Sequence, residues 1–215
     1  MKKLFIFDFD GTLIDSITDV GLCFNEALDE NNFPIFDLGE YKFLVGGDID
    51  AVILRLLNSV NASQKNILDV KSSYEKIYAI DKKINTKPFD GIVEMLKTLQ
   101  DNNISIAINS NKKDNLLVPL VDKYFSSIDF VDIVGCDSSK FPKPNPYSVN
   151  KTISNLKLPK KDVVYIGDTL TDIETAKNAN IDMFLVKWGQ AKDSDFKNRY
   201  VKKIIDTPLQ LCDVI

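Results

Sequence analysis

Two aspartates, Asp8 and Asp10, stand at the end of the apolar run LFIF (4–7) near the start of the chain, in the stretch FDFDGTLID. Burying charge without a partner costs free energy, so two carboxylates at the tip of a buried strand indicate a cation, a substrate or both beside them. Such a pair can supply a nucleophile and a general acid–base group.

Further polar side chains follow other apolar runs. Ser110 and Asn111 come after ISIAIN, Asp168 and Asp172 come after VVYIG in the stretch GDTLTD, and Lys143 lies between two prolines in KFPKPNP. In open parallel sheets, ligands bind at the carboxyl ends of the strands. The sequence therefore predicts that these groups and the first pair of aspartates surround one crevice.

The elements that must position these residues can be predicted from the pattern after Pro88. Apolar runs alternate there with amphipathic segments, which is typical of an α/β fold with a Rossmann-like parallel sheet and helices on both faces. The expected strands are 4–7, 104–109, 129–135, 162–167, 182–187 and 201–205. The expected helices are 91–102, 114–125, about 146–156, 171–179 and a short one from 207. Pro119 is expected to kink or divide the second of these.

Residues 16–85 follow a different pattern. The stretch SITD (16–19) resembles a helix capping box, and apolar residues then recur at helical spacing without strand-like alternation. The expected helices are about 17–30, 48–59 and 63–80. We therefore expect a small all-helical domain inserted after the first strand, with residues 1–15 and 86–215 forming the α/β core.

The composition excludes several classes of function. A formal net charge of −4 argues against a nucleic-acid or anionic-membrane partner. The chain has no histidine, which removes Ser-His-Asp catalysis and histidine metal sites. Cys23, Cys136 and Cys212 form no CxxC pair, so neither a disulfide framework nor a zinc site is indicated. The apolar opening is cut by Asp8 too soon for a secretory signal, and we expect a cytoplasmic protein.

The motifs resemble those of the haloacid dehalogenase superfamily of phosphohydrolases, in the form that carries a helical C1-type cap. DFDGT matches the first motif, NSN the second, the lysine of KPNP the third, and GDTLTD the fourth. Within the superfamily the chain is most similar to the phosphoglycolate phosphatase-like branch, through DGTLIDS, INSNK, KPNP, GDTLTDIETAKNA and VKWG.

This resemblance implies a role for each residue of the first motif and a metal. Asp8 would attack phosphorus and form an aspartyl phosphate, and Asp10 would act as the acid and then as the base. The cofactor would be Mg²⁺, held by Asp8, by Asp168 and by the backbone carbonyl of Asp10. Asp172 would support this site from outside or through a water molecule. Thr12 is left outside the catalytic set.

The resemblance also implies how phosphate and substrate are held. Ser110, Asn111 and Lys143 would hold the phosphoryl oxygens. In the helical insert, the Gly46–Gly47 loop and Arg55 are candidates for contacting the rest of the substrate, although a flexible turn and an ordinary surface arginine explain them as well. The expected partner is a small phosphorylated substrate, with no nucleic acid and no membrane, and the expected assembly is a monomer or homodimer.

Several activities remain open within this pattern. The first is hydrolysis of a phosphorylated metabolite such as 2-phosphoglycolate, with pyrophosphate or nucleotide hydrolysis as variants. The second is a phosphosugar mutase of the β-phosphoglucomutase type, and the third is a binding module without activity. Asp10 favours phosphoryl transfer over carbon–halogen cleavage, because the dehalogenases lack this second aspartate. The lysines of the insert look solvated, which argues against a Schiff-base phosphonate hydrolase.

Overall fold

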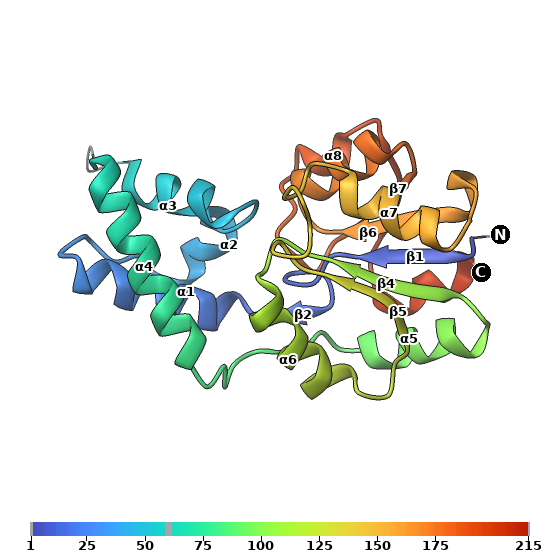
Figure 1. Ribbon diagram of the computed structural model, residues 1–215, viewed down its shortest axis with the longest axis horizontal. Helices are drawn as coiled ribbons and strands as arrows, with labels where there is room; N and C mark the ends of the chain where they lie inside the picture. The colour runs from blue at the N-terminus through green and yellow to red at the C-terminus, as the bar shows by residue number, and fades with distance from the viewer. Residues whose placement is uncertain (1, 59–61, 215) are drawn as a thin grey trace. The chain divides into compact units, whose positions relative to one another are not determined.

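The computed structural model describes residues 2–58 and 62–214 (Figure 1). The chain divides into two compact units, one made of the residues up to Ile14 and those from Lys87 onward, the other of Asp15–Thr86. The positions 59 and 215, at the ends of two expected helices, lie outside the described residues. Within the described ranges, no helix has both the length and the apolar character needed to cross a membrane.

The first unit is built on one sheet of parallel strands in the order β5-β4-β1-β6-β7-β8. The strands are β1 (Leu4–Phe7), β4 (Ser105–Asn109), β5 (Phe130–Val134), β6 (Val163–Gly167), β7 (Asp182–Val186) and β8 (Val201–Ile205). The apolar runs of the sequence thus form the expected strands, and the α/β class with a parallel sheet is confirmed. β1, which carries the first motif, lies in the middle of the sheet between β4 and β6.

Helices cover both faces of this sheet (Figure 1). They are α5 (Ile92–Asp101), α6 (Asp114–Phe125), α7 (Tyr147–Asn155) and α8 (Leu170–Ala179), with the 3₁₀ turns η3 (Lys160–Asp162), η4 (Asp195–Lys197) and η5 (Pro208–Val214). Alternate residues of β1 point to opposite faces. Phe5 and Phe7 pack with apolar residues of α5, α6 and η5, whereas Leu4 and Ile6 pack with those of α7 and α8.

β2 (Ile14–Asp15) and β3 (Lys87–Pro88) form a two-stranded sheet. α6 continues through Pro119 as one helix from Asp114 to Phe125, so the proline does not divide it.

The second unit is helical. It contains α1 (Ile17–Glu30), η1 (Leu38–Glu40), α2 (Tyr41–Leu44), α3 (Ile49–Leu57) and α4 (Gln64–Ile80), of which η1 and α2 had no counterpart among the expected helices. Its interior contains an aromatic stack in which the rings of Phe24 and Tyr74 lie 3.8 Å apart, with Tyr41 and Tyr78 stacked on either side. Gly21 permits this packing, because a Cβ atom there would lie 2.8 Å from the ring of Tyr41.

The expected capping box at the start of α1 is not formed. Ser16 occupies the N-cap position without a capping hydrogen bond from its side chain. Asp19, which would have completed the box, is buried and accepts hydrogen bonds from the backbone N–H groups of Asn85 and Thr86 and from both of their side chains. The prediction was wrong because the Asp19 carboxylate binds the far end of its own unit instead of the helix start.

Candidate active site

Three neighbouring strands deliver polar residues at their carboxyl ends. Asp8 directly follows β1, Asp168 follows β6, and Ser110 follows β4. The register pairs the last residue of β1 with Ile108 of β4 and with Ile166 of β6, so the three strand ends lie at one edge of the sheet. The parallel topology therefore brings together residues that are far apart in the sequence, as the alternating pattern predicts.

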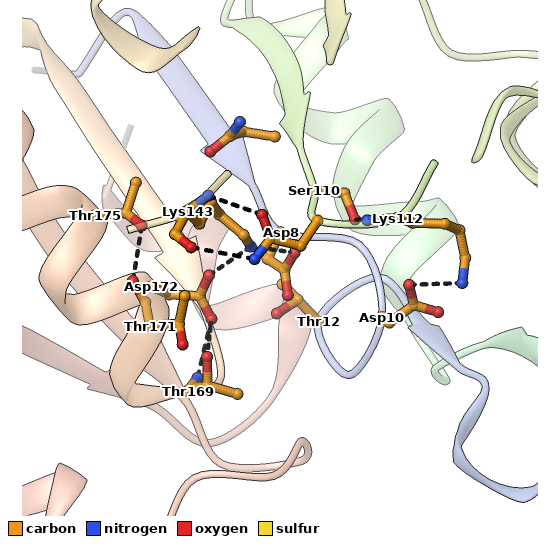
Figure 2. Close-up of polar contacts among 12 residues, drawn as sticks. Asp8, Asp10, Thr12, Ser110, Lys112, Lys143, Thr169, Thr171, Asp172 and Thr175 are labelled. Atoms are coloured by element: carbon orange, nitrogen blue, oxygen red, sulfur yellow. Dashed lines mark hydrogen bonds and ion pairs between the residues drawn. The ribbon is translucent and has the colours of Figure 1, made fainter. Parts of the chain in front are cut away.

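Lys143 joins two of the acidic residues. Its Nζ atom lies 2.6 Å from Oδ1 of Asp8 and 2.8 Å from Oδ1 of Asp172 (Figure 2). All three residues are buried: the whole-residue exposure is 7% for Asp8, 7% for Lys143 and 0% for Asp172. Buried ion pairs of this kind are stable only when their remaining hydrogen-bonding groups are also satisfied.

The backbone of Lys143 is held in place by Asn111. The Lys143 N–H donates to Oδ1 of Asn111 at 2.8 Å, and the Asn111 side-chain amide donates to the Lys143 carbonyl at 3.3 Å. This two-way contact links the loop after β4 to the loop that carries the lysine. The Asn111 side chain is thus hydrogen-bonded to the backbone of Lys143, and the role of Asn111 in binding phosphate stays a prediction.

The charges in this cluster shift one another's titration. Burial raises the pKa of the Asp8 carboxyl to about 7, against the attraction of Lys143 and with the repulsion of Asp172. Burial alone would lower the pKa of Lys143, but the carboxylates of Asp172 and Asp8 outweigh it and hold that pKa well above its ordinary value. The lysine therefore stays positively charged, and ionising Asp8 fully requires more positive charge than Lys143 supplies.

Asp168 lies in a tight cage of hydrogen bonds. The Thr12 hydroxyl donates to its Oδ1 at 2.9 Å, and the Gln190 N–H donates to its Oδ2 at 2.8 Å. Gly11 and Gly189 leave room for it, because a Cβ atom on either would lie within 2.4 Å of Asp168 Oδ2. Burial, and then the charges of nearby acidic residues, raise the pKa of Asp168 well above its ordinary value.

The two oxygen atoms of the Asp172 carboxylate have different partners. Its Oδ1 pairs with Lys143, while its Oδ2 accepts hydrogen bonds from the Thr169 N–H, the Thr169 hydroxyl and the Asp168 N–H. The contacts with Thr169 cap the start of α8. Because the helix start fixes the Asp172 side chain, Lys143 receives a rigid partner.

Asp10 points to a different partner. Its Oδ2 lies 3.0 Å from Nζ of Lys112, and Figure 2 shows this pair to the right of Asp8, with Lys143 and Asp172 to the left. The Asp10 side chain is 26% exposed, which makes it more accessible than the other acidic residues of the site. Ser110, which is buried, accepts a hydrogen bond from the Lys112 N–H at 3.1 Å.

Three carboxylates have the arrangement of a cation site. Oxygen atoms of Asp8, Asp168 and Asp172 lie within 4.8 Å of one another. When ionised, these residues carry three negative charges against the single positive charge of Lys143, so two remain uncompensated. Hard oxygen ligands in a buried acidic cluster suit a small divalent cation such as Mg²⁺.

The candidate substrate residues of the second unit form a local arrangement of their own. Gly46 and Gly47 have positive φ angles of 131° and 86°, a conformation that glycine adopts readily. Arg55 donates from Nε to the Leu44 carbonyl at 2.7 Å and from Nη2 to the Gly46 carbonyl. The arginine therefore holds the loop itself, and contact of these residues with a substrate stays a prediction.

Three residues that shape the site were given no role from the sequence. Thr12 and Gln190 hold Asp168, and Lys112 pairs with Asp10. Thr12 lies in the first motif and Lys112 is the lysine of INSNK, so both stood in recognised stretches, whereas Gln190 directly follows VKWG. The indole N–H of Trp188 also donates to the Thr12 carbonyl at 2.9 Å, which connects VKWG to the first motif.

Comparisons with a family profile and with known proteins identify the same family. The sequence profile of the haloacid dehalogenase-like hydrolases matches residues 5–186. A phosphoglycolate phosphatase of Aquifex aeolicus is 30% identical over 190 residues, covering 88% of this chain and 87% of that protein. A phosphoglycolate phosphatase of Vibrio vulnificus is 25% identical over 218 residues, covering 99% and 96%.

A solved structure extends this similarity to the whole chain. The crystal structure of a candidate phosphoglycolate phosphatase from Lactobacillus delbrueckii subsp. bulgaricus superposes with a TM-score of 0.92 at 27% identity, covering 100% of this chain and 99% of that one. The four motifs predicted this relationship, and the comparisons confirm it. The chain is an enzyme of the haloacid dehalogenase-like hydrolase family and belongs to its phosphoglycolate phosphatase-like branch.

Proposed function

We propose that this enzyme hydrolyses the phosphate ester of a small metabolite in a Mg²⁺-dependent reaction, with 2-phosphoglycolate as the first candidate. The observation that carries the proposal is the environment of Asp8, a buried carboxylate 2.6 Å from the Lys143 ammonium and grouped with Asp168 and Asp172. A nucleophile, a fixed positive charge and a set of oxygen ligands therefore meet at one point.

The acidic cluster fits Mg²⁺. Asp8 and Asp168 would hold the ion through their carboxylates, and Asp10 through its backbone carbonyl. Asp172 would support the site, because its two oxygens already bind Lys143 and the start of α8. When bound, Mg²⁺ would supply positive charge that offsets the carboxylates and the phosphoryl oxygens.

Asp8 is the proposed nucleophile. One of its oxygens forms a bond to phosphorus while the bond from phosphorus to the ester oxygen breaks, which leaves the phosphoryl group on Asp8 as an acyl phosphate. Water then attacks this phosphorus, releases inorganic phosphate and restores the carboxylate. Lys143 favours the ionised, reactive form of Asp8, because its ammonium stabilises the negative charge.

Asp10 is the proposed acid and base. It would give a proton to the departing alkoxide in the first step and take one from the attacking water in the second. An alkyl alcohol is a poor leaving group without this proton, so Asp10 matters most for metabolites of that kind. Its greater exposure is consistent with a group that meets both substrate and water.

The phosphoryl group would be bound by the residues around Asp8. The Ser110 hydroxyl and the Lys143 ammonium can stabilise negative charge on its oxygens as it transfers. Asn111 contributes by fixing the backbone of Lys143 through its amide oxygen and its amide NH₂ group. It can contact phosphate only through the amide hydrogen that does not bind Lys143. Gly46, Gly47 and Arg55 are proposed to help select the remainder of the substrate.

The choice of 2-phosphoglycolate rests on the relatives. The similar proteins of Aquifex aeolicus and Vibrio vulnificus are named phosphoglycolate phosphatases, and each match covers most of both chains. Catalytic motifs alone do not distinguish one alkyl phosphate from another. The substrate is therefore proposed from similarity, whereas the chemistry is proposed from the geometry of the site.

A panel assay tests the proposed function. Phosphate release would be measured from 2-phosphoglycolate, pyrophosphate, β-glucose 1-phosphate and mononucleotides, each with Mg²⁺ and with EDTA, in wild type and Asp8→Asn. We expect Mg²⁺-dependent release from 2-phosphoglycolate that Asp8→Asn abolishes. Isomerisation of the sugar phosphate with little phosphate release would show that the enzyme is a mutase and not a phosphatase. If the folded protein acts on no compound of the panel, both the phosphatase and the mutase hypotheses are refuted.

A further inference from the structure

The ion pair between Lys112 and Asp10 has no place in the mechanism proposed above. The two side chains lie 3.0 Å apart, and the lysine side chain is only 8% exposed (Figure 2). Lysine is rarely buried to this extent without a charged partner, because its ammonium is strongly hydrated in water. The pair therefore raises the question of what Lys112 does for Asp10.

The backbone of Lys112 is fixed on both sides. Its N–H donates to the Ser110 hydroxyl at 3.1 Å, and its carbonyl accepts from the Cys136 N–H at 2.9 Å. Gly135 allows this approach, because a Cβ atom there would lie 2.6 Å from the Lys112 carbonyl oxygen. The lysine thus extends from a fixed backbone position between the loops after β4 and β5, and the burial of its side chain further limits where the ammonium can lie.

We propose that Lys112 is a positioning residue for proton transfer by Asp10. Its ammonium binds Oδ2 of Asp10 and sets the rotation of the carboxyl group, so that Asp10 is held where the ester oxygen departs. This inference rests on the proposed function, since it assigns a role within that reaction. The proton passes from Asp10 to the ester oxygen as the bond to phosphorus breaks and returns from water in the second step, while Lys112 keeps its own protons.

A purely structural role makes a different prediction. An ion pair that only stabilises the fold would, when broken, lower activity to the same extent on every substrate. Loss of acid positioning instead slows the phosphorylation of Asp8 by substrates whose leaving group needs a proton and spares those whose leaving group does not, whereas the later hydrolysis step is the same for all substrates. Leaving-group dependence therefore separates the two explanations.

The test compares two substrates in Lys112→Met, Lys112→Gln and Lys112→Arg. The substrates are 2-phosphoglycolate, with an alkyl leaving group, and 4-nitrophenyl phosphate, whose phenolate leaves without protonation. For the Met and Gln variants we expect kcat/KM, which reports the phosphorylation of Asp8 and not the later hydrolysis step, to fall roughly 10-fold or more on 2-phosphoglycolate and less than about 3-fold on the aryl phosphate. Lys112→Arg keeps the positive charge and the hydrogen-bond donors, so it should retain most of the wild-type activity on 2-phosphoglycolate.

Two controls sharpen the comparison. Lys97→Met removes the same charge from an exposed position on α5 and should leave both rates unchanged. In the Asp10→Asn background, Lys112→Met should add little further loss on 2-phosphoglycolate, because the group that it positions is already gone. Thermal unfolding of each variant identifies any that fail to fold, and the Gln and Arg variants then carry the comparison.

Three outcomes would overturn the inference while leaving the proposed function intact. These are an equal loss of kcat/KM on both substrates, a rise in KM for 2-phosphoglycolate without a fall in kcat, and full additivity with Asp10→Asn. The second would make Lys112 a substrate contact. Failure of the wild-type enzyme to release phosphate from any compound of the panel would instead refute the proposed function itself.

Discussion

The ammonium of Lys143 lies 2.6 Å from Oδ1 of Asp8, although 135 residues separate the two in the chain. Both residues are buried, and the same ammonium also pairs with Asp172 at 2.8 Å. One positive charge thus serves two carboxylates, while the third, Asp168, is held by hydrogen bonds from Thr12 and Gln190. This imbalance of charge at the end of the central strand has consequences for metal binding and for the pH dependence of stability.

Magnesium should stabilise the folded protein. When ionised, the buried carboxylates of Asp8, Asp168 and Asp172 leave two negative charges uncompensated, and a bound divalent cation would offset them. Saturation at about 100 times Kd corresponds to ~2.7 kcal/mol, or a rise in Tm of roughly 5–10 °C for a chain of this size. Thermal unfolding with MgCl₂ against NaCl of equal ionic strength measures this, and Asp168→Asn should lose most of the rise. The same Tm in both salts would count against a metal at this site.

Without metal, stability should fall as the pH rises toward neutral. The folded pKa of Asp8 is raised from 3.8 to about 7, and that of Asp168 is raised as well. The folded state then binds more protons than the unfolded state between these values, so its stability is full at low pH and is lost as the pH increases through that window. The slope is at most about 1.4 kcal/mol per pH unit for each group.

The Asp8→Asn variant isolates the contribution of one carboxyl group to this slope. Urea unfolding in EDTA should show the variant gaining stability relative to wild type between about pH 4 and about pH 7, and saturating Mg²⁺ should reduce the difference. A difference that does not change with pH would show that burial does not raise the pKa of Asp8 in the folded protein.

Thr12→Val should weaken the binding of Mg²⁺. The Thr12 hydroxyl donates to Asp168 Oδ1 at 2.9 Å, and valine has nearly the same shape but no donor. Partners that orient a metal ligand typically contribute about 10- to 100-fold in affinity, so we expect a loss near the lower value. Isothermal titration calorimetry with Mg²⁺ measures this affinity directly. Thr98→Val, on α5, is the matched control and should bind Mg²⁺ as wild type does.

Asp19→Asn should destabilise the helical unit without affecting the chemistry at Asp8. The Asp19 carboxylate accepts hydrogen bonds from Asn85 and Thr86, and an amide would direct donor hydrogens at donors. We expect a loss of roughly 2–3 kcal/mol in the free energy of unfolding. Urea unfolding checks this, with Asp29→Asn at an exposed position of α1 as the control. Equal stability of the two variants would contradict the structural role of Asp19.

The sheet could be predicted from the sequence because its signals are local. The run at 4–7 is apolar throughout, and the structure forms β1 over Leu4–Phe7. The strand ends could then be assigned to one edge, because parallel strands have only one carboxyl edge. That rule predicts that Asp8 and Asp168 lie close together.

The details of the site could not be predicted in this way, because they depend on contacts between distant segments. In the sequence Lys112 is one of two adjacent lysines, and nothing local distinguishes it from Lys113 as a partner for Asp10. Only the folded structure brings its ammonium to Asp10. Asp19 stands at the expected place for a capping box, yet its partners lie 66 and 67 residues further along the chain. Local pattern predicts what a side chain can do, and tertiary structure decides which partner it meets.

The most direct test of the mechanism is to trap the phosphoryl group on Asp8. Borohydride reduces an acyl phosphate, so quenching the enzyme during turnover of 2-phosphoglycolate with Mg²⁺ should convert Asp8 to homoserine, as found by peptide mass spectrometry. Asp8→Asn should show no conversion and a loss of turnover of roughly 10³-fold or more. Homoserine at position 8 is the result that the proposed mechanism predicts. Turnover without it, or reduction at another aspartate, would contradict the assignment of Asp8 as the nucleophile.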